Sequence, residues 1–488
     1  MPPTSFIDPL PTRAERKAAG TSARDRAPLA DQARFEPGPD RDPVGLLLEQ
    51  STTRVPDLVP IRHARMLVSP FTFFRGAALP MAADLAASPH SGLTVQLCGD
   101  AHLSNFGAFA SPERRLVFDI NDFDETLPGP FEWDVKRLAA SVVVAARDNG
   151  FSDKAARRAA KAGVASYREA MRDFARTSIL DVWGTVGDIE ARLEEFRGEV
   201  LGTERTSGKK PGKKARKRVV QRLSSFDKAM AKARRQDSTR AARKLTEIVD
   251  GHRRIVADPP LIVPLDQMTD QPAAERRAFL ESLLEEYRLT LSVDRRDLLG
   301  HFALRDVAHK VVGVGSVGTR AWILLLEADD GDTPLILQAK QAEASVLSRF
   351  LAPSEYENQG RRVVVGQRAT QAASDVFLGW VRAAGLDGVP RDFYVRQLKD
   401  WKASADIATL GPDNLLAYAR ICGWTLARAH AKTGDRVAIA SYLGGSERFD
   451  DALTDFAVAY ADQTVRDHAA LSAAVASGRA QAAEIGAA

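Results

Sequence analysis

GDAHLSNFG (Gly99–Gly107) and FDINDFDET (Phe118–Thr126) are the two most informative segments of this chain. The first motif carries Asp100, His102 and Asn105, and the second adds several acids a few residues later. Phosphoryl transfer uses this set of side chains, because a carboxylate orients the attacking hydroxyl while amide and carboxylate oxygens hold Mg²⁺ against the phosphates. The two segments therefore point to phosphoryl-transfer chemistry.

Two buried strands are predicted beside these motifs. The apolar, β-rich run Leu93–Gly99 leads into Asp100, and the run Arg114–Ile120 ends just before Asp122. Neighbouring strands that end here would present Asp100, Asn105 and Asp122 at one mouth, on loops braced by rigid structure. Since Mg²⁺ favours oxygen ligands and keeps several waters, one Asn and one Asp would suffice to hold it against substrate phosphates.

The first motif resembles the G-D-x-H-x-x-N loop of aminoglycoside- and choline-kinase-like phosphotransferases. The resemblance implies that Asp100 is the catalytic Asp, that His102 is a second catalytic residue of the loop, and that Asn105 binds metal. The segment INDFDET is similar to the I-D-[FW]-[DE] segment of that superfamily, which implies that Asp122 is the second metal ligand.

The position of the next helix supports this alignment. The superfamily carries a Y-D-L-A-like helix start at a similar interval, and WDVKRLA puts Asp134 12 residues after Asp122. A helix is therefore predicted from Asp134 onward. The interval from Asn105 to Asp122 is longer than usual, so Asp119 and Asp124 are alternatives for the metal role.

The whole chain also resembles an uncharacterised bacterial family, domain-of-unknown-function family 2252. This resemblance covers most of the chain, but it implies no established reaction. The segments that carry it are RMLVSPFTFFRGAA, QLCGDAHLSNFG, FDINDFDETLPGPFEWDVKRLAAS, VGVGSVGTR and YVRQLKDWK.

A glycine-rich block lies in the second half of the chain. HKVVGVGSVGTRAWILLLE (His309–Glu327) predicts a strand, a glycine turn and a second strand, and PLILQAKQAE predicts a third. This pattern is typical of a kinase glycine-rich hairpin, whose backbone N–H groups stabilise phosphates and whose third strand carries a lysine. An unrelated β-hairpin is the alternative. The candidate nucleotide-binding residues are Gly313, Gly315, Ser316, Gly318 and Lys340.

Three residues are candidates for the acidic partner of Lys340: Glu343, Glu355 and Glu357. Glu357 is favoured, because a helix over 355–374 would place it at a kinase-like distance. The run Phe393–Lys402 predicts a strand that leads into a hinge between lobes. The segment Asn414–Asp435 predicts a helix, and its LARAHA sequence resembles the helix before the catalytic loop of aminoglycoside-kinase-like enzymes.

The order of these parts differs from that of ordinary kinases. There the glycine hairpin, the lysine and the hinge precede the G-D-x-H-x-x-N loop, whereas here the loop comes first. We expect a circularly permuted, two-lobed, protein-kinase-like α+β fold, since permutation is tolerated where chain ends lie close together. The expected parts are a flexible arm at 1–54, a catalytic-loop lobe at 55–300 with a basic helical insertion near 204–247, a nucleotide-binding β-rich lobe at 301–402, and helices at 403–488 that complete the larger lobe.

Basic residues outside the motifs have two interpretations each. Arg75 is expected to pair with a structural carboxylate, although it could also reach a phosphate or an acidic partner. The run Lys209–Lys244 predicts a solvated helical insertion, with binding to a polyanion or an acidic surface as the alternative. It carries no RNA-binding signature, so a nucleic-acid partner is not expected.

Composition sets outer bounds on the class of protein. With 488 residues, 44% hydrophobic and 27% charged, and a net charge of +4, the chain predicts an ordinary soluble protein of two or three domains or lobes. Cys98 and Cys422 are the only cysteines, which fits a reducing cytoplasm rather than a disulfide framework. The N-terminus has no apolar core of a secretory signal, and the longest apolar run, Leu138–Ala146, is too short to span a bilayer.

Together the motifs predict a phosphotransferase that uses Mg²⁺ and ATP to modify a hydroxyl of a small molecule or a protein. Asp100 would orient and deprotonate that hydroxyl, and Lys340 would position the nucleotide phosphates. The same site could transfer AMP to a protein or serve as an inactive nucleotide sensor. A metal-dependent phosphoesterase is a further alternative, and it would need a two-metal cluster of acids near His102: Asp100, Asp119, Asp122 and Asp124.

Overall fold

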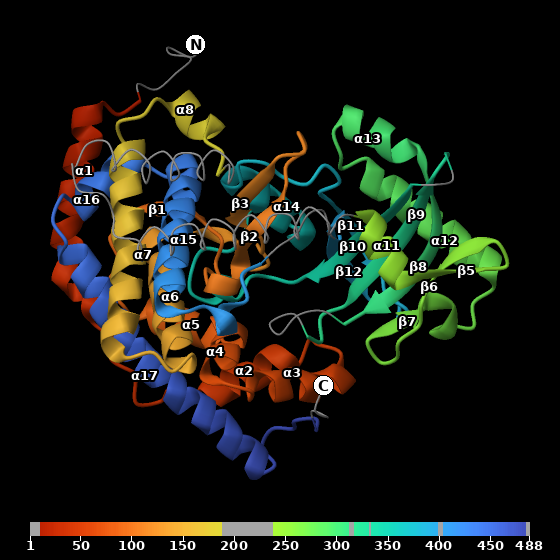
Figure 1. Cartoon of the computed structure of the whole chain (residues 1–488), viewed down its shortest axis with the longest axis horizontal. Helices are drawn as coiled ribbons and strands as arrows, with labels where there is room; N and C mark the ends of the chain where they lie inside the picture. Colours follow the sequence, from red (N-terminus) through yellow and green to blue (C-terminus); the bar gives the residue numbers. More distant parts are fainter. Residues whose placement is uncertain (1–9, 188–237, 312–316, 331–332, 399–403, 485–488) are drawn as a thin grey trace, which may run out of the picture.

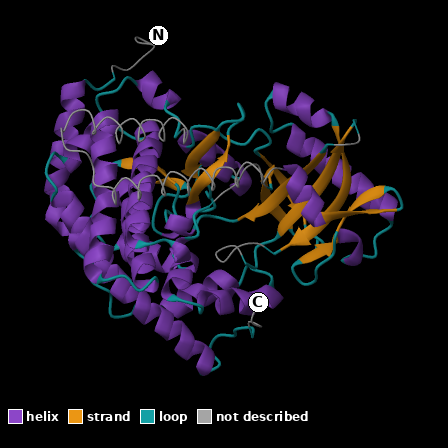
Figure 2. Ribbon diagram, in the orientation of Figure 1, coloured by secondary structure: helices purple, strands orange, loops and turns teal. Residues whose placement is uncertain are grey.

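The computed structural model of the chain is a mixed α+β fold, as the sequence predicts. It describes residues 10–187, 238–311, 317–330, 333–398 and 404–484. A helix-rich part lies beside a part built on a six-stranded sheet (Figures 1 and 2).

Long helices from the middle and the end of the sequence build the helix-rich part. They are α6 (Phe131–Asp148), α7 (Asp153–Phe174), α8 (Ile179–Gly184), α15 (Pro412–Thr433), α16 (Arg436–Leu443) and α17 (Arg448–Ala476). Helix α6 lies at the centre, in contact with α7, α15 and α17, and is buried along nearly its whole length. Glycines let α7 and α15 approach closely, since a Cβ atom on Gly423 would lie 2.1 Å from the carbonyl oxygen of Gly163.

The described residues 10–54 of the expected flexible arm at 1–54 fold onto this part, together with the segment that follows them. Their helices are α1 (Arg13–Arg26), α2 (Pro43–Ser51), α3 (Val59–Met66), α4 (Pro70–Gly76) and α5 (Ala78–Ala86). Arg41 forms ion pairs with Asp84 at 2.7 Å and with Asp467 at 2.6 Å. Arg24 donates a hydrogen bond to the carbonyl oxygen of Tyr442 at 2.8 Å. The composition of this segment suggested disorder, but its arginines bind residues far along the chain.

Two short sheets carry the candidate catalytic loop. Strand β1 (Thr94–Leu97) pairs with β4 (Leu127–Pro130), and β2 (Phe106–Ala110) pairs with β3 (Leu116–Ile120), both antiparallel. Strands β1 and β3 form within the predicted runs, but each pairs with another strand rather than with its predicted neighbour. Phe106 lies opposite Ile120, so the β2–β3 hairpin brings Asn105 beside Asn121.

The second part is built on an antiparallel sheet. Its strand order is β11 (Gly379–Ala384), β12 (Pro390–Gln397), β10 (Pro334–Ala342), β9 (Ala321–Ala328), β8 (Phe302–Lys310) and β7 (Ile262–Pro264). Strands β8, β9 and β10 confirm the predicted succession of three strands around the glycine block. Lys340, on β10, lies opposite Tyr394 of β12 on one side and Ala321 of β9 on the other.

Smaller elements surround this sheet. They are α11 (Ser238–Leu245), β5 (Thr246–Val249), β6 (His252–Ile255), α12 (Ala273–Arg288), α13 (Val293–Gly300) and α14 (Gln359–Thr370). Helix α14 begins later than predicted, because Asn358 caps it by accepting the N–H of Arg361 at 2.9 Å. Residues 204–237 of the expected basic insertion lie outside the described residues. Among the helices that the structure describes, none has the length and apolarity that crossing a membrane requires.

Candidate functional site

The loop that begins at Gly99 is held by a buried carboxylate of α6. Asp134 accepts hydrogen bonds from the backbone N–H groups of Cys98, at 2.8 Å, and Gly99, at 3.0 Å. His430 of α15 lies 3.2 Å from the same carboxylate. Gly99 has a φ of +85°, and a Cβ atom there would lie 2.2 Å from the carbonyl oxygen of Glu125. No side chain fits this turn, and Asp134 fixes it in place.

Asp100 lies at the start of the loop. Its Oδ1 is 2.8 Å from both Nε and Nη2 of Arg137, which follows Asp134 on α6. Its Oδ2 is 3.6 Å from Nε2 of His102, beyond hydrogen-bond length. Asn105 donates from Nδ2 to the backbone carbonyl oxygen of Asp100 at 2.8 Å. Arg137 therefore fixes the carboxylate through one oxygen and leaves the other for a ligand.

His102 is enclosed by the loop and the surrounding helices, with 4% of its surface exposed. Burial is the main cause that lowers the pKa of its imidazole to about 4, against the opposing charge of Asp100. The ring is therefore neutral at pH 7. Its Nδ1 has no hydrogen-bond partner among the described residues and no access to solvent. This environment suits a residue that supports the loop better than one that carries a proton.

Among the acids at the end of β3, Asp119 is engaged in a buried ion pair. Its carboxylate contacts Arg428 of α15, and neither side chain is more than 1% exposed. It also accepts the backbone N–H of Ala372 at 3.0 Å. Asp122 and Asp124 differ, since their side chains are 31% and 29% exposed. Both side chains are therefore partly open to a ligand, whereas that of Asp119 is not.

Lys340 reaches these two acids from the sheet. Its ammonium contacts the carboxylate of Asp124 and lies 3.8 Å from Oδ2 of Asp122. The hydroxyl of Tyr394 donates to Oδ1 of Asp124 at 2.9 Å. Burial alone would lower the pKa of Lys340, but the two carboxylates raise it more, so the net shift is upward. The lysine is charged at neutral pH and joins a strand to a turn 216 positions away.

Basic side chains of the sheet part hold the backbone of the turn Asn121–Thr126. Arg362 of α14 donates to two carbonyl oxygens of this turn, at 2.7 and 2.8 Å, and Arg396 of β12 donates to a third, at 3.0 Å. Neither these two arginines nor Tyr394 was predicted from the sequence as a residue of the site. The only signal is indirect: the pairing of β10 with β12 sets Tyr394 opposite Lys340, and no local motif encodes that pairing.

Glu125 lies behind the exposed acids, facing the sheet part. Its carboxylate accepts the backbone N–H of Val346 at 2.7 Å, and its carbonyl oxygen accepts the hydroxyl of Ser345 at 2.9 Å. Burial raises the pKa of this carboxyl to about 7, although the nearby charge of Arg362 opposes the shift. Glu125 thus anchors the turn to the segment after β10.

The donor set at the end of the β2–β3 hairpin fits a hard cation. Asn105 and Asp122 lie at the same end, because the N–H of Asn121 donates to the carbonyl oxygen of Asn105 at 2.8 Å. They offer the amide and carboxylate oxygens that Mg²⁺ prefers. Within the described ranges, no group of three or more His, Cys, Asp or Glu side chains is arranged to hold a metal ion. That part of the chain does not present the converging acids that a two-metal hydrolase needs.

The glycine loop is only partly described. Gly313, Gly315 and Ser316 lie outside the described residues. Gly318 has a φ of +89°, and its carbonyl oxygen accepts the N–H of Val55 at 2.8 Å. The end of the loop therefore meets the segment that joins α2 to α3.

The glutamates expected to pair with Lys340 lie elsewhere. Glu355 and Glu357 are exposed and precede α14. The carboxylate of Glu343 accepts hydrogen bonds from Thr53 at 2.9 Å and from Gln341 at 3.0 Å. Among the described residues, the acids in ion-pair contact with Lys340 are instead the two on the turn after β3.

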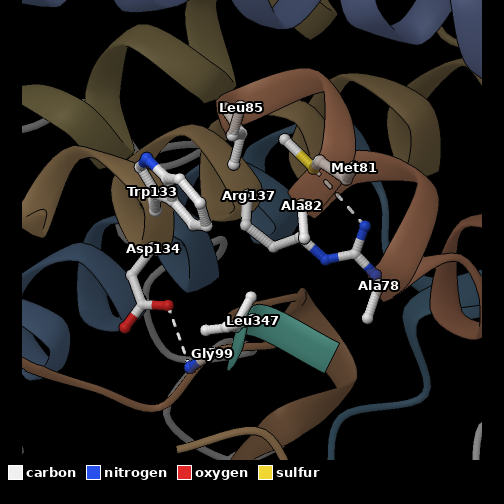
Figure 3. Close-up of a pocket in the computed structure, with 9 residues that line it drawn as sticks. All are labelled: Ala78, Met81, Ala82, Leu85, Gly99, Trp133, Asp134, Arg137 and Leu347. Carbon is white, nitrogen blue, oxygen red and sulfur yellow. Dashed lines mark hydrogen bonds between the residues drawn. The ribbon is translucent and has the colours of Figure 1, made fainter. Parts of the chain in front are cut away.

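A small cavity lies between α5 and α6, behind the loop (Figure 3). Its volume is about 10 Å³, roughly the space that one water molecule needs. It is therefore too small for a nucleotide. The residues that line it are Ala78, Met81, Ala82, Leu85, Gly99, Trp133, Asp134, Arg137 and Leu347.

Comparison with models of protein families assigns this chain to a family. A family model described as "Uncharacterized protein conserved in bacteria (DUF2252)" matches residues 54–474. The chain belongs to this family. Neither the curated proteins nor the solved structures give a significant match. The region shared with the DUF2252 family contains the loop at Gly99, the turn after β3 and Lys340, so it holds every residue of the candidate site.

Proposed function

We propose that this DUF2252 protein is a phosphotransferase that uses Mg²⁺ and ATP and has a circularly permuted, kinase-like, two-lobed fold. The observation that carries the proposal is the contact of Lys340 with Asp124, beside Asp122. In kinases, the third-strand lysine and the acids after the catalytic loop belong to one phosphate site. Here the two motifs occur in the opposite order along the chain, and they nevertheless meet.

The chemistry follows from the roles of three groups. Oδ2 of Asp100 orients the acceptor hydroxyl, whose oxygen attacks the γ-phosphorus of ATP as its proton passes to Asp100. The bond from that phosphorus to the β–γ bridging oxygen breaks, and ADP leaves. Lys340 offsets the negative charge of the phosphates, and Tyr394 holds Asp124 in place. Mg²⁺, held by Asn105 and Asp122, would stabilise charge on the phosphate oxygens.

Asp100→Asn tests the chemical step, because the amide keeps the size of the side chain but cannot take the proton. We expect near-normal ATP affinity and a loss of turnover on the order of 10²-fold or more. The assay follows γ-labelled and α-labelled ATP in the presence of cell lysate. Asp148→Asn, at the exposed end of α6, is the control and should retain wild-type turnover.

The labels also separate the proposal from its alternatives. Transfer of the γ-label supports phosphorylation, whereas α-label on protein supports AMP transfer. The sensor alternative is favoured by one contact, since Arg137 engages Oδ1 of Asp100 and reduces the freedom of the carboxylate. If neither label moves and Asp100→Asn behaves like the wild type, the protein is a nucleotide sensor rather than an enzyme.

A further inference from the structure

A second arginine near Asp100 belongs to the N-terminal helices. Arg75 lies in the last turn of α4 and is partly exposed. It follows Phe74, whose carbonyl oxygen accepts a hydrogen bond from the same Arg137 that binds Asp100. Burial lowers the pKa of the Arg75 guanidinium, and the nearby charge of Asp100 opposes this shift.

Arg75 is not used to cap its own helix. The carbonyl oxygen of Phe74 accepts a hydrogen bond from Arg137 at 2.7 Å, and that of Gly76 accepts one from Arg62 at 2.9 Å. Nε of Arg75 is enclosed without an acceptor, and its guanidinium has no hydrogen bond or ion pair to any residue that the structure describes. The structural carboxylate that the sequence suggested as its partner is therefore not in contact with it.

Asp100 does not provide a partner for both arginines. Its Oδ1 binds Arg137, whereas Arg75 has no hydrogen bond or ion pair within the described residues. Arg75 therefore keeps a partly exposed guanidinium group that no carboxylate contacts. Such a group favours an anionic ligand at this end of the site.

Another arginine, in the segment between α2 and α3, serves the opposite end. Arg54 donates to the carbonyl oxygen of Val317, in the described end of the glycine loop, at 2.5 Å. The acids whose charges act on Arg54 are Glu343, Glu125 and Asp124, and the last two lie on the turn beside Lys340. Arg54 therefore lies on the side proposed for the nucleotide, whereas Arg75 lies on the side of the group that orients the acceptor.

We propose that Arg75 binds an anionic group, a phosphate or a carboxylate, on the acceptor whose hydroxyl Asp100 orients. The inference rests on the proposed function and narrows its substrate class to hydroxyl compounds that carry a negative charge. A planar guanidinium can bind such a group through two parallel hydrogen bonds. Arg75 is an acceptor-binding residue in this scheme, and Arg137 positions Asp100.

The test compares matched probes in calorimetry. Glycerol, glycerol 3-phosphate and glycerate are titrated into the wild type, Arg75→Gln, Arg75→Lys and the control Arg34→Gln, which removes an exposed arginine. We expect the wild type to bind at least one charged probe, and Arg75→Gln to weaken that binding about tenfold or more. Arg75→Lys should retain part of it, and glycerol should bind none of the variants. Thermal melting checks that each variant is folded.

Mg-ATP and Mg-ADP are titrated into the same proteins. We expect Arg75→Gln to leave both affinities unchanged, since Arg75 serves the acceptor. Weaker binding of Mg-ATP but not Mg-ADP would place Arg75 on the terminal phosphate of the nucleotide and overturn the inference. So would Mg-ATP binding to the wild type without any binding of the charged probes, while the proposed function would survive. If the wild type fails to bind Mg-ATP, that result contradicts the proposed function and, with it, the acceptor role of Arg75.

Discussion

The two halves of the candidate site are held by different parts of the molecule. The loop Gly99–Asn105 is fixed from the helix-rich part, through Asp134 and Arg137 of α6. The turn Asn121–Thr126 is fixed mainly from the sheet part, through Lys340 and the groups around it. Only the short β2–β3 hairpin connects the two directly in sequence.

This difference determines how the site can respond to a ligand. The loop presents Asp100 from a closely packed core, whereas side chains of the sheet part hold the partly exposed acids of the turn. Two hydrogen bonds nevertheless tie the turn to the loop side, from Asn121 to the carbonyl oxygen of Asn105 and from Thr126 to that of Leu97. A shift of the sheet part relative to the helices would therefore change the distance between Asp100 and the acids only at the expense of these contacts.

The largest effect is expected on the loop side, from Asp134→Ala. The substitution removes the acceptor of two backbone N–H groups and leaves His430 without its carboxylate. We expect the free energy of unfolding to fall by about 3–5 kcal/mol, the scale of breaking a buried charged network. Chemical denaturation measures it, with Asp148→Ala at the exposed end of α6 as the control. A loss no larger than that of the control would mean that the loop does not depend on α6.

A pH effect of nearly that size is expected from His102. Its folded-state pKa of about 4 lies below the ordinary value of 6.5, so the unfolded chain takes up a proton first as the pH falls. The stability from the buried neutral ring is complete above pH 6.5 and is lost between pH 6.5 and pH 4. The wild type should lose about 3 kcal/mol more than His102→Gln between pH 7 and pH 4.

Denaturation of both proteins across that range provides the measurement. His301→Gln, at a side chain that is 65% exposed, is the control and should follow the wild type. If the wild type and His102→Gln lose stability in parallel, the imidazole of His102 is not held neutral by burial.

A matched pair of tyrosines gives a smaller, more selective test of the comparison. The hydroxyl of Tyr418 donates to the carbonyl oxygen of Phe106, at 2.9 Å, on the loop side, whereas that of Tyr394 donates to Asp124, also at 2.9 Å, on the turn side. Each change to Phe should cost about 1 kcal/mol of stability. Only Tyr394→Phe should also weaken the binding of Mg-ATP, by a few-fold, because it frees Asp124. Equal effects of the two variants on nucleotide binding would remove the distinction between the halves.

Local patterns predicted the parts of this molecule that depend on local sequence. The strand before Asp100, the three strands around the glycine block and the helix that starts near Asp134 all follow from apolar runs and turn residues. The interval to Asp134 marked this residue as a helix start, whereas its role in bracing the loop came from the structure. These features rest on contacts within a few tens of residues, which a sequence pattern can encode.

The contacts that distinguish one acid after β3 from another could not be predicted from the sequence. Asp119 is withdrawn from the site by Arg428, 309 positions away, whereas Asp124 is paired by Lys340, 216 positions away. Nothing in FDINDFDET (Phe118–Thr126) itself separates these carboxylates. The expected partner Glu357 failed for the same reason, since α14 begins after it and the turn supplies the acids. Long-range pairing decided each case.

We propose that Lys340 and the acids of the turn form a site for Mg²⁺ and nucleotide. Calorimetry of ATP, with and without Mg²⁺, tests it on the wild type, on Lys340→Met and on the control Lys154→Met, which alters an exposed lysine of α7. We expect Mg²⁺-dependent binding to the wild type and the control, and an affinity about tenfold or more lower in folded Lys340→Met. Absence of binding to the wild type at millimolar nucleotide, or binding that Lys340→Met leaves unchanged, would contradict it.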